Sequence, residues 1–348
     1  MLDYLIIGSG LAGISFSEMA LHNGKSILVI ADNSQNSSKI AAGLYNPVIL
    51  KRFSEVGQAK EHLQVMNEFL LGLEQKLNPK VDFKMPILRK FFSIEEQNNW
   101  FAASDKVNLA SYLSNQLISK KFESIYSPFG YGEVLQTGYV DTALLLEKYK
   151  NYLITNQLFL KESFDYGLLQ EETNGIRYKD IQARHIIFAE GFGMHANPYF
   201  QHLPLDGTKG ELLIIKAPLL DLDVILNTSL YILPLGNDLF KIGATYNWDD
   251  KTALPTEAGK NELVQRIKEI ITCDFEIMEH HAGVRPTVKD RKPLIGTYEH
   301  HNSIHILNGL GTRGVMLGPA MAKALFENIE YQKPLDRFVD IKRFAKKR

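Results

Sequence analysis

A glycine turn close to the start of the chain limits the possible folds more than any other feature. It follows Tyr4–Gly8 (YLIIG), a continuous apolar run that is typical of a central parallel strand covered on both faces. Gly8, Gly10 and Gly13 form the pattern G-x-G-x-x-G, which allows a tight turn, a close backbone approach to a pyrophosphate and close packing of helix on strand. A helix is expected over 11–22, with its first N–H groups facing the phosphates. The turn therefore predicts a dinucleotide site formed by Gly8, Ser9, Gly10, Leu11, Ala12 and Gly13.

An acid near the end of a second predicted strand completes this unit. The strand covers 26–30 (SILVI), and Asp32 follows it at about the distance at which an acid binds the ribose hydroxyls of a dinucleotide. Because successive strand residues point to opposite faces, Asp32 can take this role only where the strand has already ended or bulged. The other interpretation of Asp32 is an exposed turn aspartate. From these residues alone, the turn fits a nicotinamide or a flavin dinucleotide.

Composition excludes several classes of protein. The chain has 348 residues, enough for two domains, and its formal net charge of -1 gives no general attraction to nucleic acid or an anionic membrane. The basic cluster 342–348 is interpreted as a solvated tail. Cys273 is the single cysteine, so no disulfide framework or cysteine-rich metal site is expected, and no metal is predicted. No apolar run approaches the ~18 residues of a membrane helix and no basic leader precedes the first strand, so we expect no membrane span and a cytoplasmic location.

The middle of the chain is predicted to contain helices and short strands. Helical spacing of apolar residues occurs over 59–77 and from residue 95 to about 117. The segment 132–153 predicts a short strand and then a helix that is capped near Asp141 or Thr142.

The remaining segments indicate how the domains are organised. A buried strand ending in glycines is expected over 184–193, and strand-like runs between 207 and 285, with a helix at 262–271, indicate a mostly antiparallel sheet. A strand, a glycine turn and a long helix return within 303–329. The sequence thus predicts an α/β fold (α+β overall), in which a Rossmann-like domain made of separated segments holds an inserted substrate domain. The predicted boundaries are 1–75, 132–206 and 286–348 for the first domain, and 76–131 and 207–285 for the second.

Several motifs carry a resemblance to a known family along nearly the whole chain. They are IIGSGLAG, SSKIAAGLYNP, RHIIFAEG, GTKGELLII, LYILPLGNDLFKIGATY, AGVRPTVKDRKPLIG and LNGLGTRGVMLGP, in that order. Together they resemble the D-amino-acid-oxidase-like flavoproteins, above all glycine oxidases and the C-terminal oxidase module of the bifunctional enzyme that modifies the tRNA wobble uridine. The resemblance implies FAD, not a nicotinamide, as the cofactor of the Rossmann-like domain.

The resemblance also implies which further residues contact the FAD. In this family the acid that binds the ribose usually stands one position earlier, where this chain has Ala31. Cys273 does not stand where relatives attach the flavin covalently, so noncovalent FAD is expected. The implied contacts beyond the glycine turn are Asp32, Asn33, Ala41, Ala42, Gly43, Leu44, Ala189, Gly191, Gly309, Gly311, Thr312, Gly314, Val315 and Met316.

Four residues match substrate-site positions of glycine oxidases. Arg285 in GVRP stands where the family places the arginine that binds the substrate carboxylate, and Arg313 in GTRG matches a second arginine near the flavin. Tyr231 in LYILP matches a tyrosine that contacts the same carboxylate, and Tyr246 in GATY falls beside the pocket.

Two of these residues, and some of their neighbours, also have a structural interpretation. Arg285 could pair with an acid such as Asp290, and Tyr231 could be a strand aromatic in the core. By strand alternation only one of His280 and His281 can face the pocket, and without a third ligand both are interpreted as structural. Lys209 is either a loop lysine or a charge near the flavin.

The resemblance implies an FAD-dependent oxidase or dehydrogenase of a small amino acid or secondary amine, which passes a hydride from the carbon bearing the amine to flavin N5. Oxygen, a quinone or a partner protein could then reoxidise the flavin. One alternative is an oxidase of a carboxymethylaminomethyl-modified tRNA wobble uridine, although the chain is not basic. Another is a flavin-binding protein without catalysis.

Overall fold

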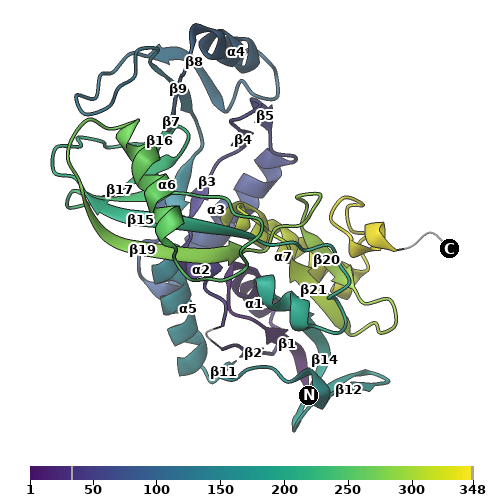
Figure 1. Ribbon diagram of the computed structural model, residues 1–348. Helices are drawn as coiled ribbons and strands as arrows, with labels where there is room; N and C mark the ends of the chain where they lie inside the picture. The colour runs from purple at the N-terminus through teal and green to yellow at the C-terminus, as the bar shows by residue number, and fades with distance from the viewer. Residues whose placement is uncertain (33, 346–348) are drawn as a thin grey trace.

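The computed structural model describes residues 1–32 and 34–345, arranged around two eight-stranded sheets. In Figure 1 the first sheet, which contains the N-terminal strand, lies in the lower part of the view and the second lies above it.

The first sheet is built on the parallel strands expected from the glycine turn. β1 (Leu2–Ile7) pairs in parallel with β2 (Ile27–Ile30) on one side and with β14 (Ile181–Phe188) on the other. The C-terminal half of β14 pairs in parallel with β21 (Ile304–Asn308), so the start, middle and end of the chain share one sheet. The other strands are β11 (Phe159–Leu160) beside β2, β20 (Leu294–Thr297) beside β21, and the hairpin β12 (Leu169–Glu172) and β13 (Gly175–Tyr178) beside the start of β14.

Both faces of this sheet are covered, which explains the continuous apolar run in β1. Tyr4 and Ile6 belong to the hydrophobic cluster that contains the helices, whereas Leu5 and Ile7 belong to a second cluster on the opposite face. All four side chains are buried. The helices that contribute most to the first cluster are α1 (Leu11–His22), α3 (Ala59–Leu77), α5 (Thr142–Thr155) and α7 (Gly314–Tyr331), and α4 (Ile94–Ser104) adds Trp100 and Ala103.

The second sheet is mostly antiparallel, as the sequence predicts. Every pair of neighbours runs antiparallel except β16 and β7. α6 (Glu257–Lys268) packs on one face through Leu263 and Ile267, which join a third hydrophobic cluster with Leu213 and Ile215 of β15. The strands in order are β19 (Glu276–Arg285), β15 (Thr208–Lys216), β18 (Leu239–Gly243), β17 (Tyr231–Gly236), β16 (Ile225–Asn227), β7 (Ile87–Lys90), β9 (Tyr131–Val134) and β8 (Leu113–Ile118).

Shorter elements complete the fold beside the two large sheets. A three-stranded sheet joins segments that are far apart in the sequence, in the order β3, β10, β6. The short elements are α2 (Ser37–Ile40), β3 (Leu44–Tyr45), β4 (Val48–Ile49), β5 (Ser54–Glu55), β6 (Asp82–Lys84), α4 (Ile94–Ser104), β10 (Gly138–Val140), and the 3-10 turns η1 (Tyr166–Leu168), η2 (Gly191–Ala196) and η3 (Ile341–Phe344).

Local capping explains where two of the predicted helices begin. The α5 helix starts after Asp141, whose carboxylate accepts a hydrogen bond from the Leu144 N–H at 3.0 Å, so the predicted cap is confirmed. The helix predicted over 262–271 spans Glu257–Lys268 instead, because the Thr256 hydroxyl caps an earlier start.

The helix expected over 95–117 is wrong in its second half. α4 ends at Ser104, and Leu113–Ile118 forms β8, which pairs with β9. Leu109 and Tyr112 continue the helical spacing in the sequence, but both are buried in a turn that leads into β8.

The pairing of β9 differs from one of the predicted domain boundaries. β9 lies in the second sheet, so Gly132–Val134 is paired there although the predicted boundary ends the substrate domain at residue 131. The domain boundaries otherwise stay a prediction. No helix among residues 1–32 and 34–345 is both long and apolar enough to span a membrane.

Candidate active site

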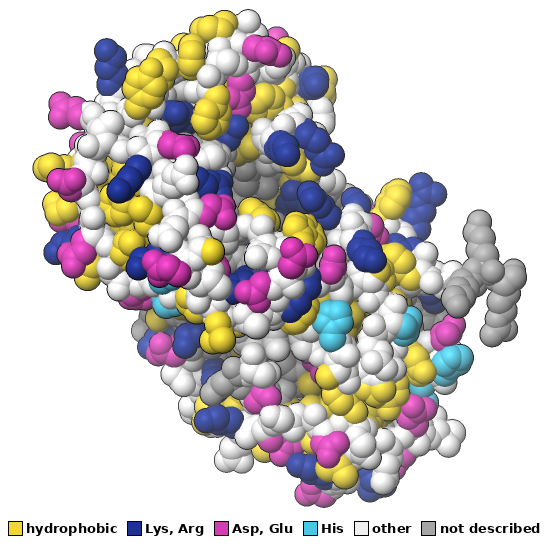
Figure 2. Space-filling view, viewed as in Figure 1, with side chains coloured by type: hydrophobic (Ala, Val, Ile, Leu, Met, Phe, Trp, Pro, Cys, Tyr) yellow, Lys and Arg dark blue, Asp and Glu magenta, His cyan; other side chains and the backbone are white. Residues whose placement is uncertain are grey.

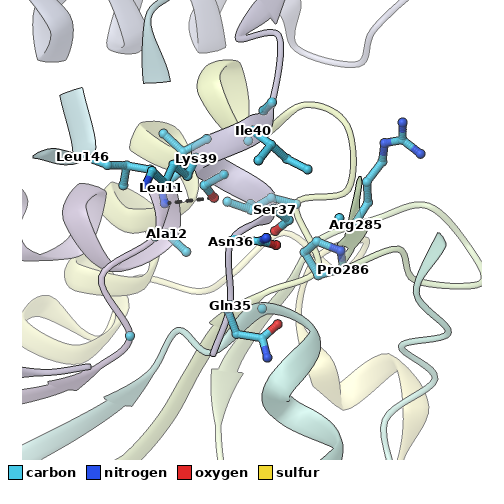
Figure 3. A pocket seen from close by; sticks show the side chains of 18 of the residues that line it. Leu11, Ala12, Gln35, Asn36, Ser37, Lys39, Ile40, Leu146, Arg285 and Pro286 are labelled. Carbon is cyan, nitrogen blue, oxygen red and sulfur yellow. Dashed lines mark hydrogen bonds between the residues drawn. The ribbon is translucent and has the colours of Figure 1, made fainter. Parts of the chain in front are cut away.

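A cavity of about 1280 Å³ lies where residues of the two large sheets meet. Its walls include the glycine turn, the α2 segment, the end of β14, and parts of β15, β17 and β19. Figure 3 shows Leu11 and Ala12 of α1 beside the segment Gln35–Ile40, with Arg285 and Pro286 at the other end of the group.

The glycine turn has the geometry that its sequence predicts. Gly8 has a φ of 106°, and a Cβ at this position would overlap the Ala189 carbonyl group. A Cβ on Gly13 would overlap the Gly8 carbonyl oxygen, so α1 approaches the end of β1 more closely than any other residue would permit. Gly8 and the first residues of α1 line the cavity, while Gly13 packs behind them.

Two helix N-termini at this cavity lack the usual partners for their first N–H groups. Gly10, the N-cap of α1, has no side chain that could cap the helix, and Arg313, the N-cap of α7, makes no capping hydrogen bond with its side chain. Neither first turn contains an acid. Among residues 1–32 and 34–345, the only side-chain hydrogen bond to the first N–H groups of α1 is a long one, from the Leu11 N–H to Ser38 Oγ at 3.4 Å (Figure 3). Helix N-termini in this state favour an anionic ligand, such as a phosphate.

Arg285 ends β19 and lines the cavity at the face of the second sheet. Its guanidinium lies across Gly210 of β15 and beneath the ring of Tyr246, with 4.6 Å between Cζ and the ring centroid. Its hydrogen bonds are long, from Nη1 and Nη2 to the Thr245 carbonyl oxygen at 3.4 and 3.5 Å. Most of its five N–H donors are therefore available to a ligand.

Asp290, the acid that could have paired with Arg285, does not do so. Asp290 pairs with Arg343, at 2.8 Å between Oδ2 and Nε. Among the described residues, no acid lies within ion-pairing distance of Arg285. A partly buried guanidinium without a counter-charge favours the binding of an anion.

Tyr231 lies on the same wall of the cavity as Arg285. It begins β17 opposite Gly243, and its hydroxyl occupies the space that a Cβ on Gly243 would need. Burial raises the pKa of the Tyr231 phenol, and the nearby Arg285 offsets only part of this effect. The phenol is therefore protonated and able to donate a hydrogen bond. Tyr246 also lines the cavity, so the structure brings three of the four predicted substrate residues together.

Arg313, the fourth, does not itself line the cavity, although its neighbours Thr312 and Gly314 do. Burial lowers the pKa of Arg313, and the positive charges of Arg291 and Arg52 lower it further, whereas Tyr246 acts in the opposite direction. Arg313 thus belongs to a group of three arginines, for none of which the described residues supply an ion-pair partner. Figure 2 shows basic side chains gathered at the hollow between the upper and lower parts of the molecule. Sequence reasoning missed Arg52, which stands outside the motifs, and Arg291, which stands in the same motif as Arg285 but was given no role there.

The comparison with protein families decides the class of this site. The model of the family described as "FAD dependent oxidoreductase" (DAO) matches residues 3–328. The chain belongs to this family. It is an FAD-dependent oxidoreductase, and the predicted fold class and cofactor are confirmed.

Relatives of this oxidoreductase include the two groups that the motifs resemble. Glycine oxidase of Bacillus subtilis (strain 168) is 24% identical over 233 residues, which cover 62% of this chain and 61% of that protein. The tRNA 5-methylaminomethyl-2-thiouridine biosynthesis bifunctional protein MnmC of Burkholderia mallei (strain SAVP1) is 32% identical over 105 residues, which cover 28% of this chain and 16% of MnmC. Both alignments thus span less than two thirds of the relative. A crystal structure of glycine oxidase from Bacillus cereus ATCC 14579 shares the fold, with a TM-score of 0.78 at 19% identity over 96% of each chain.

Most residues predicted to contact the FAD lie at the cavity, and the uncapped N-terminus of α1 fits its pyrophosphate. Gly309 and Met316 do not line the cavity: a Cβ on Gly309 would press on Val288, and Met316 is buried in the core. Asn33 lies outside the described residues. The predicted residues that line the cavity are Gly8, Ser9, Gly10, Leu11, Ala12, Asp32, Ala41, Ala42, Gly43, Leu44, Ala189, Gly191, Gly311, Thr312, Gly314 and Val315.

Asp32 lies at the cavity because β2 ends at Ile30, two residues before it. Its Oδ2 accepts a hydrogen bond from Ser163 Oγ at 2.6 Å, and its Oδ1 accepts from the Ser34 N–H at 2.9 Å. Burial acts to raise the pKa of Asp32, but these hydrogen bonds outweigh it and the pKa lies below its usual value. The carboxylate is thus ionised at neutral pH. Its ribose role stays a prediction.

Glu190 is a residue of this cavity that sequence reasoning missed. Its Oε1 accepts a hydrogen bond from the Tyr166 hydroxyl, and its Oε2 accepts one from Asn197 Nδ2 at 2.8 Å. Burial raises the pKa of Glu190 to about 7, although both hydrogen bonds act against this. The signal was an acid between Ala189 and Gly191, at the end of a buried strand.

Three further basic residues do not line the cavity. Lys209 is buried and forms an ion pair with Asp250, so its charge is not presented to the cavity. His280 Nε2 lies 2.8 Å from Glu211 Oε2, and His281 pairs with Glu279 at 2.6 Å. Neither histidine lines the cavity.

Proposed function

We propose that this oxidoreductase oxidises a small amino acid or secondary amine whose carboxylate is bound by Arg285. The observation that carries this proposal is the Arg285 guanidinium itself, which lines the cavity with only two long hydrogen bonds and no acidic partner among the described residues. A guanidinium binds a carboxylate through two parallel hydrogen bonds, which fixes the orientation of the ligand as well as its position.

The neighbours of Arg285 support the same role. Tyr231 keeps its proton because burial raises its pKa, so its hydroxyl can donate to the same carboxylate. Tyr246 is 62% exposed, and its ring covers the Arg285 guanidinium. Tyr246 is therefore placed to lie beside the route by which the substrate enters the cavity. Arg313 is proposed to attract this carboxylate together with Arg52 and Arg291, because all three are cations without an acidic partner in the described chain.

The role of these residues in the reaction is to orient the substrate. FAD, when bound, accepts the hydride from the carbon that bears the amine, and water then hydrolyses the imine product. Arg285 and Tyr231 would hold the substrate by its carboxylate, so that the carbon bearing the amine has a fixed orientation. Fixing the reacting group in this way lowers the entropic cost of the reaction. The uncapped N–H groups at the start of α7 would stabilise negative charge on the group that receives the hydride.

Three related expectations belong to this proposal. The FAD is bound noncovalently, which agrees with the position of Cys273 against the α6 hydrophobic cluster and away from the cavity. Oxygen is the proposed electron acceptor. The cytoplasm is the proposed location.

An anaerobic substrate screen tests the proposal. Glycine, sarcosine, D-alanine and iminodiacetate are each added to the oxidised yellow holoenzyme without oxygen, beside methylamine and dimethylamine as controls that lack a carboxylate. At least one carboxylated amine is expected to bleach the flavin about 100-fold faster than its control, because a buried charge-assisted contact is worth about 2–5 kcal/mol. If no carboxylated amine bleaches the flavin, the proposal is wrong.

A second candidate is the oxidation of a carboxymethylaminomethyl group on the tRNA wobble uridine. The observation that favours it is the group Arg52, Arg291 and Arg313, because unpaired arginines also suit a phosphate of RNA. It predicts that wobble-uridine modification changes in tRNA from a strain that lacks this protein, as measured by mass spectrometry. An unchanged modification profile rules it out. A flavin-binding protein without catalysis predicts bound FAD and no bleaching in either experiment.

A further inference from the structure

A buried charged network lies behind the face of β15 that carries the substrate wall. Lys209 is fully buried, and its Nζ lies 2.5 Å from Asp250 Oδ2, 2.5 Å from the Leu254 carbonyl oxygen and 3.4 Å from Thr252 Oγ1. All three partners belong to the segment 244–256, which connects β18 to α6. Because a buried ammonium is stable only with such partners, Lys209 ties this segment to β15.

The backbone of the same segment continues the pairing of β18 with β15. The Lys209 N–H donates to the Asn247 carbonyl oxygen at 2.9 Å, and the Asn247 N–H donates back at 3.0 Å. The Thr245 N–H donates to the Glu211 carbonyl oxygen at 3.1 Å. Since side chains alternate along paired strands, Lys209 and Glu211 point to one face, whereas Tyr246 points with Gly210 to the other.

Arg285 is held on that other face by groups from the same segment. Its guanidinium lies between Gly210 and the Tyr246 ring, and the acceptor of its two long hydrogen bonds is the Thr245 carbonyl oxygen. Two of the three contacts that place Arg285 therefore come from residues whose position depends on the pairing with Lys209 and Glu211.

We propose that Lys209, through its ion pair with Asp250, is a positioning residue that holds the segment 244–256 so that Tyr246 and Thr245 keep Arg285 ready for a carboxylate. This inference rests on the proposed function, in which Arg285 binds the substrate carboxylate. Lys209 touches neither the cavity nor a ligand, so its effect is expected to pass through the segment alone.

The segment has other anchors, so the ion pair can be removed without detaching it. Glu211 accepts hydrogen bonds from the Thr256 N–H at 2.9 Å and the Thr256 hydroxyl at 2.7 Å. Lys251 donates to Asp206 at 3.2 Å and to the Gly207 carbonyl oxygen at 2.9 Å. A variant at Asp250 is therefore expected to fold and bind FAD.

The test compares Asp250→Asn with Asp249→Asn, a matched control that removes the same charge from the neighbouring residue, whose carboxylate makes no ion pair within the described chain. Lys209→Met is a harsher second variant. For each FAD-loaded protein, acetate is titrated and its Kd read from the flavin absorption spectrum. The KM and kcat of the best substrate from the screen and the amide hydrogen exchange of peptides covering 244–256 are also measured.

For Asp250→Asn and Lys209→Met we expect the acetate Kd and the substrate KM to rise by about fivefold or more, with kcat and the Kd of FAD changed by less than about twofold. Exchange in 244–256 is expected to be faster than in the wild type, and Asp249→Asn is expected to match the wild type in every measurement.

Two results overturn the inference: unchanged exchange in Asp250→Asn, or faster exchange with an unchanged acetate Kd. The failure of the proposed function is distinguishable, because a wild-type protein that neither binds acetate nor is bleached by carboxylated amines contradicts the role of Arg285. The exchange rates still decide in that case whether Lys209 holds the segment.

Discussion

Replacement of Gly210 by alanine is expected to displace the Arg285 guanidinium and weaken carboxylate binding. A Cβ on residue 210 would lie 2.0 Å from Nη2 and 2.3 Å from Cζ of Arg285. Because non-bonded carbon atoms need about 3.5–4.0 Å, the guanidinium has to move by roughly 1.5 Å. Gly210 does not have a left-handed φ, so its backbone accepts alanine and the flexible arginine is the part that yields.

The size of the effect follows from what this displacement removes. Complete loss of a buried charged partner costs about 2–5 kcal/mol, and a displaced guanidinium that keeps one of its two hydrogen bonds should lose about 1–3 kcal/mol. This corresponds to an increase of roughly 5- to 150-fold in the Kd of acetate and in the KM of a carboxylated amine. The Kd of FAD should stay the same, because Gly210 lies at the substrate wall.

The assay is a titration of the Gly210→Ala holoenzyme with acetate, followed by the flavin absorption spectrum. Gly57→Ala is the matched control, since a Cβ on Gly57 meets nothing within 4 Å. If Gly210→Ala binds FAD and binds acetate as tightly as the wild type, Arg285 is not the carboxylate-binding group at this wall.

Other expected outcomes concern the FAD half of the cavity and stability. Burial raises the pKa of Glu190 to about 7, so its contribution to stability is complete below the unfolded pKa of 4.5 and is lost as the pH rises through 7; this amounts to at most about 3 kcal/mol. The Tm of the apoprotein should therefore fall more between about pH 5 and about pH 8 in the wild type than in Glu190→Gln, and equal slopes would contradict the assignment. Gly13→Ala should abolish FAD binding in a fluorescence titration, because its Cβ would overlap the Gly8 carbonyl oxygen. Gly72→Ala, in the exposed middle of α3 where a Cβ meets nothing, should raise the free energy of unfolding by about 0.5–1 kcal/mol in a urea titration; a destabilised variant would be inconsistent with the open environment. If Asp32 binds the ribose, Asp32→Ala should weaken the free energy of FAD binding by about 1–2 kcal/mol. An unchanged Kd of FAD would mean that Asp32 is a turn aspartate without this role.

The sequence predicts those elements of the fold whose structure depends on residues within one short segment. The glycine turn and α1 follow from residues within one short segment, and α3 from a regular apolar stripe. β8 could not be predicted, because the strand is defined by its pairing with β9 and not by its own sequence. The same limit applies to α6, whose start depends on the Thr256 cap.

In the candidate site, too, some residues could be identified from the sequence and others only from the fold. Arg285 and Tyr231 could be named because they stand in motifs, and the structure places both at the cavity. Lys209 stands in a motif too, but the face to which it points is decided by its pairing with Asn247 in a distant segment. Glu190 stands between two assigned positions of a motif and Arg52 stands outside the motifs, so only the fold brings these two residues to notice.

The most direct test of the account is anaerobic reduction of the flavin in the wild type and in Arg285→Leu, side by side, with the carboxylated amine that bleaches the wild type fastest. The account predicts that Arg285→Leu keeps its FAD and its yellow colour, and that its flavin is reduced at least about 100-fold more slowly at the same amine concentration. Equal rates in the two proteins would contradict the central claim that Arg285 binds the substrate.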